Sequence, residues 1–84
     1  MKKLVEVRQW VEVEVDESKF TKHFMKEFRR YFYPFYTIDD HIEHLAQLYA
    51  RGIADQYNFI EGYGEAKDMG IKFFNNDIEV EIYK

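Results

Sequence analysis

Two histidines at helical spacing are the residues of this chain that are best suited to chemistry. His41 and His44 are three positions apart, and Asp40 and Glu43 stand beside them. On a helix, a pair at this spacing can supply two imidazole ligands to a metal ion, and carboxylates can complete the set. No further ligand follows at a spacing that requires a metal site. We therefore predict no metal ion and no cofactor.

Nucleophilic catalysis has little support in the sequence. The chain has no cysteine, which excludes thiolate chemistry and disulfides. Its single serine, Ser18, stands at the start of an expected helix, where a hydroxyl group usually caps the backbone. We therefore predict that the protein is not an enzyme. Metal binding or catalysis at His41 and His44 stays as a second alternative function.

The glycine-bounded segment 62–70 is a candidate binding loop. It lacks the Gly-Lys-Ser/Thr ending of a phosphate-binding loop and the helix that should follow that loop. It is either a long connection between two strands or a flexible binding loop with the aromatic Tyr63 at its tip.

Charge is sorted along the chain. Residues 18–33 hold five basic residues and one acid, a net charge of +4, while the other residues hold seven basic and fifteen acidic ones, a net charge of −8. Charge gathered on one surface steers partners. A helix over 17–33 would carry a basic face that could follow nucleic-acid phosphates, although the total charge of −4 counts against that alternative. Its residues are Lys19, Lys22, Lys26, Arg29 and Arg30.

The first strand offers an acidic surface instead. Residues 4–15 alternate between valines at odd positions and mostly polar residues at even positions, which is typical of a strand with one buried face. Trp10 breaks the alternation and indicates either a bulge near Gln9 or an exposed ring. If this strand pairs with the last strand, one face gathers acidic and aromatic residues, namely Glu6, Trp10, Glu12, Glu14, Glu79, Glu81 and Tyr83.

Two helices are expected between the strands. Residues 17–33 carry aromatic residues at helical spacing, and Pro34 ends this helix. The buried stripe of this helix and its link comprises Phe20, Phe24, Met25, Phe28, Tyr31, Phe32 and Phe35.

The second helix, over 37–51, has Thr37 as its N-cap and Asp40 three residues later, a variant of the capping box. Gly52 suits the left-handed position after its end. The link between the helices is short, so we expect a helical hairpin.

The last third is predicted to hold strands. Residues 56–61 contain the strand-forming Tyr57 and Phe59, and residues 71–74 and 78–83 are expected to form a hairpin that turns at 75–77. The sequence therefore predicts an α+β fold of order β-α-α-β-β-β, with a two-helix hairpin packed on one face of a mostly antiparallel sheet. We expect residues 1–84 to form a single domain.

These observations favour a small acidic protein-binding module, an inhibitor or accessory protein that engages a basic, possibly nucleic-acid-binding, surface of a partner protein. Direct nucleic-acid binding is the first alternative, and the open sheet face also allows a homodimer. The longest apolar run is far shorter than the roughly 18 residues of a membrane span, so we expect a cytoplasmic protein. In size, acidity and aromatic content the chain is similar to accessory proteins with which phages and mobile elements block host defence enzymes.

Overall fold

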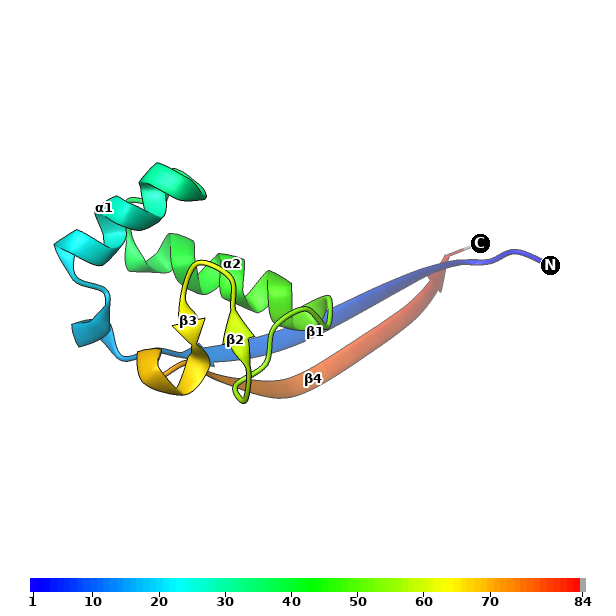
Figure 1. The fold of residues 1–84 in the computed structure, drawn as a ribbon. Coiled ribbons are helices and arrows are strands. Elements are labelled where there is room, and N and C mark those ends of the chain that lie inside the picture. Colours follow the sequence, from blue (N-terminus) through cyan, green and yellow to red (C-terminus); the bar gives the residue numbers. More distant parts are fainter. Residues whose placement is uncertain (84) are drawn as a thin grey trace.

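The chain adopts an α+β fold in which two helices pack on a two-stranded antiparallel sheet, in the predicted order of elements (Figure 1). The computed structural model describes the backbone of residues 1–83 and the side chains of residues 1–75. The sheet pairs β1 (Leu4–Glu14) with β4 (Lys72–Tyr83), the arrangement on which the predicted acidic face depends. The helices are α1 (Lys22–Tyr31) and α2 (Ile38–Ala50). A second, smaller sheet pairs β2 (Phe59–Ile60) with β3 (Gly64–Glu65).

The β1–β4 ribbon extends beyond the helical body as an arm. In Figure 1 the helices and the small sheet gather at one end of the ribbon, and both chain termini lie at the other. The molecule is correspondingly elongated, with extents of 51 × 23 × 19 Å. Helix α2 has 13 residues and β1 has 11, but a helix rises about 1.5 Å per residue and a strand about 3.3 Å. The helix is therefore too short to cover the whole strand.

A bulge interrupts the ladder of β1 and β4 at Trp10. Gln9 pairs with Ile78 and Val11 pairs with Asn75, so two residues of β4 oppose Trp10 alone. The predicted hairpin at 75–77 is therefore wrong, because β4 runs without a break from Lys72 to Tyr83. The sequence explains the bulge: apolar residues of β4 occupy odd positions up to Phe73 and even positions from Ile78. An extra residue lets both sets pair with the odd-numbered side of β1.

The first helix starts later than predicted. Asp16 caps only a short 3₁₀ turn, Glu17–Lys19, by accepting a hydrogen bond from the Ser18 amide. Helix α1 begins after Thr21, whose hydroxyl oxygen accepts a hydrogen bond from the Phe24 amide. Asp16 and Thr21 both have the extended backbone of an N-cap, so each one starts a new helical segment. The single helix expected over 17–33 is therefore divided into a 3₁₀ turn and α1. Lys19 therefore does not belong to the helix that carries the other cations.

The second helix confirms its predicted boundaries. The Thr37 hydroxyl oxygen accepts a hydrogen bond from the Asp40 amide, and the Asp40 carboxylate accepts one from the Thr37 amide, which completes the capping box. Arg51 follows the last turn, and Gly52 has a φ of 73°. The two hydrogen bonds satisfy backbone N–H groups that have no partner inside a helix.

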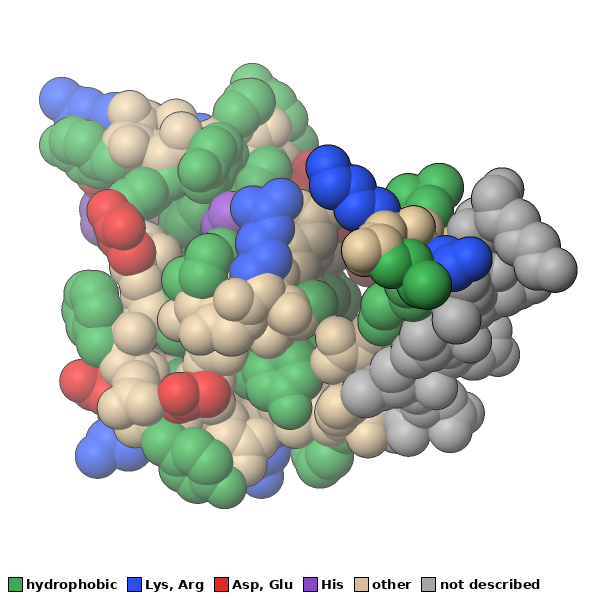
Figure 2. All heavy atoms as spheres, turned by 90° about the vertical axis from the view of Figure 1, so that its right-hand side faces the viewer, with side chains coloured by type: hydrophobic (Ala, Val, Ile, Leu, Met, Phe, Trp, Pro, Cys, Tyr) green, Lys and Arg blue, Asp and Glu red, His purple; other side chains and the backbone are tan. Residues whose placement is uncertain are grey.

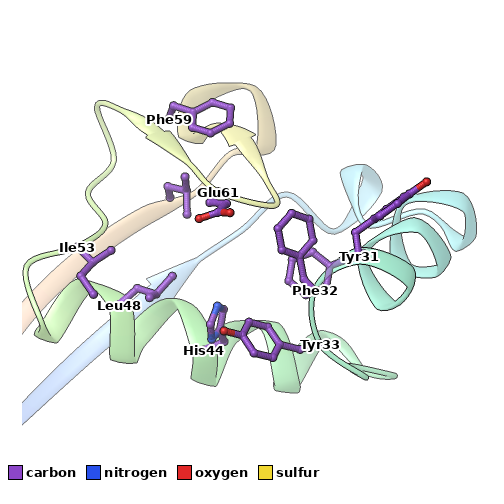
Figure 3. A pocket seen from close by; sticks show the side chains of 10 residues that line it. Tyr31, Phe32, Tyr33, His44, Leu48, Ile53, Phe59 and Glu61 are labelled. Atoms are coloured by element: carbon purple, nitrogen blue, oxygen red, sulfur yellow. The ribbon is translucent and has the colours of Figure 1, made fainter.

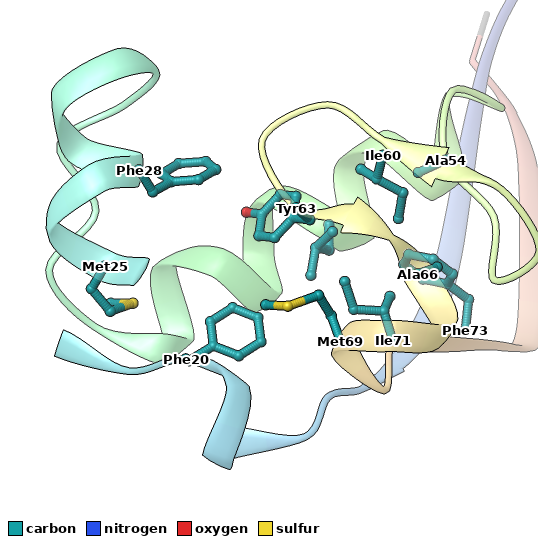
Figure 4. Close-up of a cluster of buried hydrophobic side chains, with 11 residues drawn as sticks. Phe20, Met25, Phe28, Ala54, Ile60, Tyr63, Ala66, Met69, Ile71 and Phe73 are labelled. Atoms are coloured by element: carbon teal, nitrogen blue, oxygen red, sulfur yellow. The ribbon is translucent and has the colours of Figure 1, made fainter. Parts of the chain in front are cut away.

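The core lies between the helices, the small sheet and the covered half of the ribbon (Figure 4). Leu45 of α2 and Ile71, just before β4, are almost fully buried within it. Tyr49 of α2 stacks on Phe73 of β4 with ring centroids 4.7 Å apart. These contacts attach α2 to the odd-numbered face of the sheet, where Val11 and Val13 also pack against the core. The even-numbered face is turned away from the helices.

Candidate functional site

The face of the β1–β4 sheet turned away from the helices, here called the open face, carries the predicted acidic and aromatic residues of β1. The sequence predicted either a bulge or an exposed ring at Trp10. The structure has both, because the ladder bulges at this residue and its ring is 64% exposed. Glu12, Glu14 and Phe74 are also exposed. Glu12 pairs with Phe74, and Glu14 pairs with Lys72. Exposed aromatic rings among carboxylates are a common property of protein-binding surfaces.

The open face is less uniformly acidic than the sequence indicated. Arg8 donates a hydrogen bond to Glu6 at 2.5 Å, and Lys72 stands opposite Glu14. The ladder places Glu81 opposite Glu6 and Glu79 opposite Arg8. The side chains of Glu79, Glu81 and Tyr83 lie outside the described residues. Arg8 and Lys72 thus stand opposite carboxylates, and Glu6 with Glu81 is a like-charged pair, an arrangement that destabilises a sheet.

The predicted basic face is only partly assembled. Lys22, Lys26 and Arg30 are exposed on α1. Arg29 is half-buried, donates a hydrogen bond to the Phe35 carbonyl oxygen at 3.2 Å, and lies over the Tyr36 ring. Arg29 therefore holds the link between the helices. On the side of the molecule shown in Figure 2, basic and acidic side chains are scattered singly among hydrophobic ones, and no area of one sign dominates.

His41 is a buried core residue. Its Nδ1 atom lies 2.8 Å from the Tyr63 hydroxyl oxygen. Its ring meets those of Phe28 and Phe35 edge-on, with centroids 4.6 and 5.1 Å away. Burial lowers the pKa of His41 to about 4, with a smaller contribution from nearby His44. A metal ion at His41 would have to enter this shell of rings or displace Tyr63.

His44 has a different environment from His41. It is half-buried and contacts the rings of Tyr33 and Phe35. Burial, and then the charge of Arg51, lower its pKa and favour the neutral ring. In the part of the chain with described side chains, no three His, Asp or Glu residues gather as metal ligands do. The structure therefore separates the two histidines into a core residue and a wall of the groove described next.

An apolar groove of about 850 Å³ opens between the end of α1, helix α2 and β2 (Figure 3). Phe32 and Tyr33 face Leu48 and Ile53 across it, with His44 below and Glu61 above in this view. Most of its apolar walls are exposed to solvent. We call it the aromatic groove; the described residues that line it are Phe28, Tyr31, Phe32, Tyr33, His44, Leu48, Ile53, Phe59, Ile60 and Glu61.

The sequence did not reveal this groove. Tyr31 and Phe32 were assigned to the buried stripe of the first helix, which is wrong, since both are exposed. A usable signal was present: three consecutive aromatic residues before Pro34 cannot all point to one side of a helix. The alternative of a flexible binding loop over 62–70 with Tyr63 at its tip is also wrong. Tyr63 is only 5% exposed and belongs to the core.

The described part of the chain contains no helix with the length and apolar character of a membrane span. Comparison of the chain with protein-family models, with curated proteins and with solved structures finds no match.

Proposed function

We propose that this protein is a small protein-binding module, an inhibitor or accessory protein whose open face engages a basic surface of a partner protein. The observation that carries the proposal is the exposure of Trp10, 64%, next to Glu12 on the same face of β1. Tryptophan is enriched among the residues that dominate binding energy. A large apolar ring held in water is costly for a free monomer, and a partner that covers it removes that cost.

The backbone around Trp10 supports a preformed binding surface. The bulge opposite Trp10 is bracketed by regular pairs on both sides, and the Gln9 side chain donates a hydrogen bond to the Asn75 side chain at 3.1 Å. Bulges direct side chains and are common near functional sites. A backbone held by two paired strands need not be ordered on binding, which lowers the cost of association.

Charge indicates the chemistry of the partner. Glu12 and Glu14 are exposed beside Trp10, and carboxylates two positions apart on one strand are about 6.6–6.8 Å apart. Such a row fits a groove lined by Lys and Arg, including one that normally binds nucleic acid. The proposal assigns no catalytic role to the chain.

The proposal is tested by capture from the native host with four tagged proteins: the wild type, Trp10→Ala, Glu12→Lys/Glu14→Lys and Lys22→Glu/Lys26→Glu. A partner that binds the open face is retained by the wild type and by the α1 variant and is lost from the other two. The purified partner should then bind less tightly as salt concentration rises, because exposed charges are screened.

The opposite pattern would contradict the proposal. If only Lys22→Glu/Lys26→Glu loses its partner, and the wild type shifts DNA or RNA in a gel, the exposed cations of α1 form the binding surface. Circular dichroism of each variant shows whether the fold persists, which is expected because all four charged positions are exposed.

A further inference from the structure

The aromatic groove is a second exposed apolar surface, separate from the open face. Its lining comes from the ends of α1 and α2 and from β2, and it shares no residue with the open face. Ile53 and Phe59, on two of its walls, are 66% and 64% exposed. Contiguous exposed apolar surface around a concave site is typical of interaction sites. The two surfaces can therefore be tested independently.

The walls of the groove are held in place before any ligand arrives. Phe32 packs on the buried Phe28 with ring centroids 5.0 Å apart. Tyr33 stacks on Phe35 at 5.5 Å and contacts His44 at 5.1 Å. These side chains are already ordered, so a ligand need not immobilise them, and that saves binding free energy.

The exposure of the groove walls, rather than the size of the groove, favours a peptide over a small molecule. Its volume of about 850 Å³ lies in the upper part of the range of roughly 300–1,000 Å³ for ligand pockets. Small-molecule sites enclose most of the ligand, whereas these walls remain largely open to solvent. An open groove with apolar walls suits several side chains projecting from one face of a peptide.

The charge of the groove selects the chemistry of that peptide. Glu61 is the one acid among the described lining residues, and none of them is Lys or Arg. Because its pKa is lowered, the His44 ring adds no positive charge near neutral pH. A ligand cation would meet Glu61 and the faces of the surrounding aromatic rings, which also attract cations.

We propose that the aromatic groove binds a peptide segment of a partner protein that presents bulky apolar side chains next to a Lys or Arg. The apolar side chains would cover the walls formed by Phe32, Ile53 and Phe59. The cation would pair with Glu61.

The test uses two fluorescently labelled helical peptides of equal length, one built from Leu and Lys and the other from Leu and Glu. Fluorescence anisotropy measures the binding of each. We expect the Leu/Lys peptide to bind the wild type at least about tenfold more tightly. Equal binding of both peptides, or binding of neither, would overturn the proposal.

Two matched pairs of variants locate the binding. Phe59→Ser should weaken Leu/Lys binding about tenfold or more, as the loss of a central anchor does. Tyr57→Ser, at a position that is 81% exposed and outside the groove, should leave Leu/Lys binding unchanged.

Glu61→Lys should reverse the preference toward the Leu/Glu peptide. Glu12→Lys makes the same change of net charge on the open face, and it should leave the preference for the Leu/Lys peptide unchanged. If both lysine variants act alike, the peptide responds to net charge alone and the proposal fails.

A second copy of the chain is the competing occupant of the groove. Sedimentation velocity of the wild type and of Phe59→Ser distinguishes it. Self-association that Phe59→Ser abolishes would make the groove a homodimer interface and overturn the peptide proposal. Monomers of both proteins, with the peptide preferences above, would support it. Loss of binding by Trp10→Ala concerns only the open face, so the two proposals can fail separately.

Discussion

His41 Nδ1 and Tyr63 Oη lie 2.8 Å apart in the core, although the two residues are 22 positions apart in the sequence. The contact joins α2 to the turn between β2 and β3. Burial lowers the pKa of His41 and raises that of Tyr63, so both groups are neutral in the folded protein at neutral pH. Among the described residues, His41 Nε2 has no hydrogen-bond partner. The aromatic shell around the imidazole therefore makes its protonation costly.

His41 should make folding stability depend on pH. Its pKa is about 4 in the folded chain and near 6.5 in the unfolded chain. The unfolded state thus binds the proton first, and stability falls as pH is lowered from 6.5 toward 4, after which this loss levels off. Between pH 7 and pH 5 we expect His41 to remove about 2 kcal/mol. Urea unfolding at several pH values measures this dependence.

The control variants for this pH dependence are His41→Gln and His23→Gln. The first should be less stable at pH 7 but lose much less stability between pH 7 and pH 5. His23 is exposed on α1, so its replacement should keep the wild-type dependence. His44, whose pKa is also lowered, adds a residual loss of the same sign in every variant. A His41→Gln protein with an undiminished pH dependence would show that His41 is not the source.

Removing the Tyr63 hydroxyl should lower the free energy of unfolding, because it removes the hydrogen-bond partner of His41. In Tyr63→Phe, His41 has neither ring nitrogen hydrogen-bonded to a described residue. A buried polar group left without a partner costs about 1–3 kcal/mol. Tyr57→Phe, at an exposed position, should change the free energy of unfolding by less than about 0.5 kcal/mol. Equal stabilities of the two variants would mean that the His41–Tyr63 contact does not contribute.

The sequence was most informative where local rules decide the structure. The alternation of residues 4–15 predicted β1, and Thr37 with Asp40 predicted the start of α2 to the residue. Both signals involve neighbours along the chain, whose geometry is the same in any fold. The pairing of the first and last strands was only a condition of the acidic-face hypothesis, and the structure establishes it.

The errors arose where distant contacts decide the structure. Asn75, Asn76 and Asp77 have turn-forming side chains, but β1 is long enough to pair on both sides of them, so they lie in or beside a bulge. The burial of His41 was not predicted, because the rings that enclose it, those of Phe20, Phe28 and Tyr63, all belong to segments far from it in the sequence. The aromatic groove was missed for the same reason. Ile53 and Phe59 face Phe32 only after the chain has folded back on itself.

The capping box of α2 should contribute measurably to stability. In Thr37→Ala, the Asp40 amide loses its bond to the Thr37 hydroxyl, 3.2 Å in the native structure. We expect a loss of about 1 kcal/mol in the free energy of unfolding, the usual value for an N-cap. Thr37→Ser keeps a hydroxyl acceptor and should stay within a few tenths of a kcal/mol of the wild type. Chemical denaturation of both variants measures the difference, and an unchanged midpoint in Thr37→Ala would show that the cap is dispensable.

Two glycines with the same backbone conformation should differ in their tolerance of alanine. Gly52 and Gly70 have φ values of 73° and 63°, a left-handed conformation that costs other residues about 1–2 kcal/mol. A Cβ atom on Gly52 meets no described atom within 4 Å, whereas one on Gly70 would lie 2.7 Å from Asp16 Cβ and 3.1 Å from its amide nitrogen. Asp16 cannot easily move, because its amide donates a hydrogen bond to the Met69 carbonyl oxygen at 3.1 Å.

Gly70→Ala should therefore lose roughly 1–3 kcal/mol more than Gly52→Ala, the usual range for forced overpacking. The free energies of unfolding of the two variants provide the comparison, and the backbone penalty common to both cancels in their difference. Hydrogen exchange at the Asp16 amide adds a local measurement. It should become faster in Gly70→Ala relative to the global stability, because the clash separates the end of β1 from Met69. Equal losses in both variants, with unchanged protection of Asp16, would show that the two segments move apart at no cost.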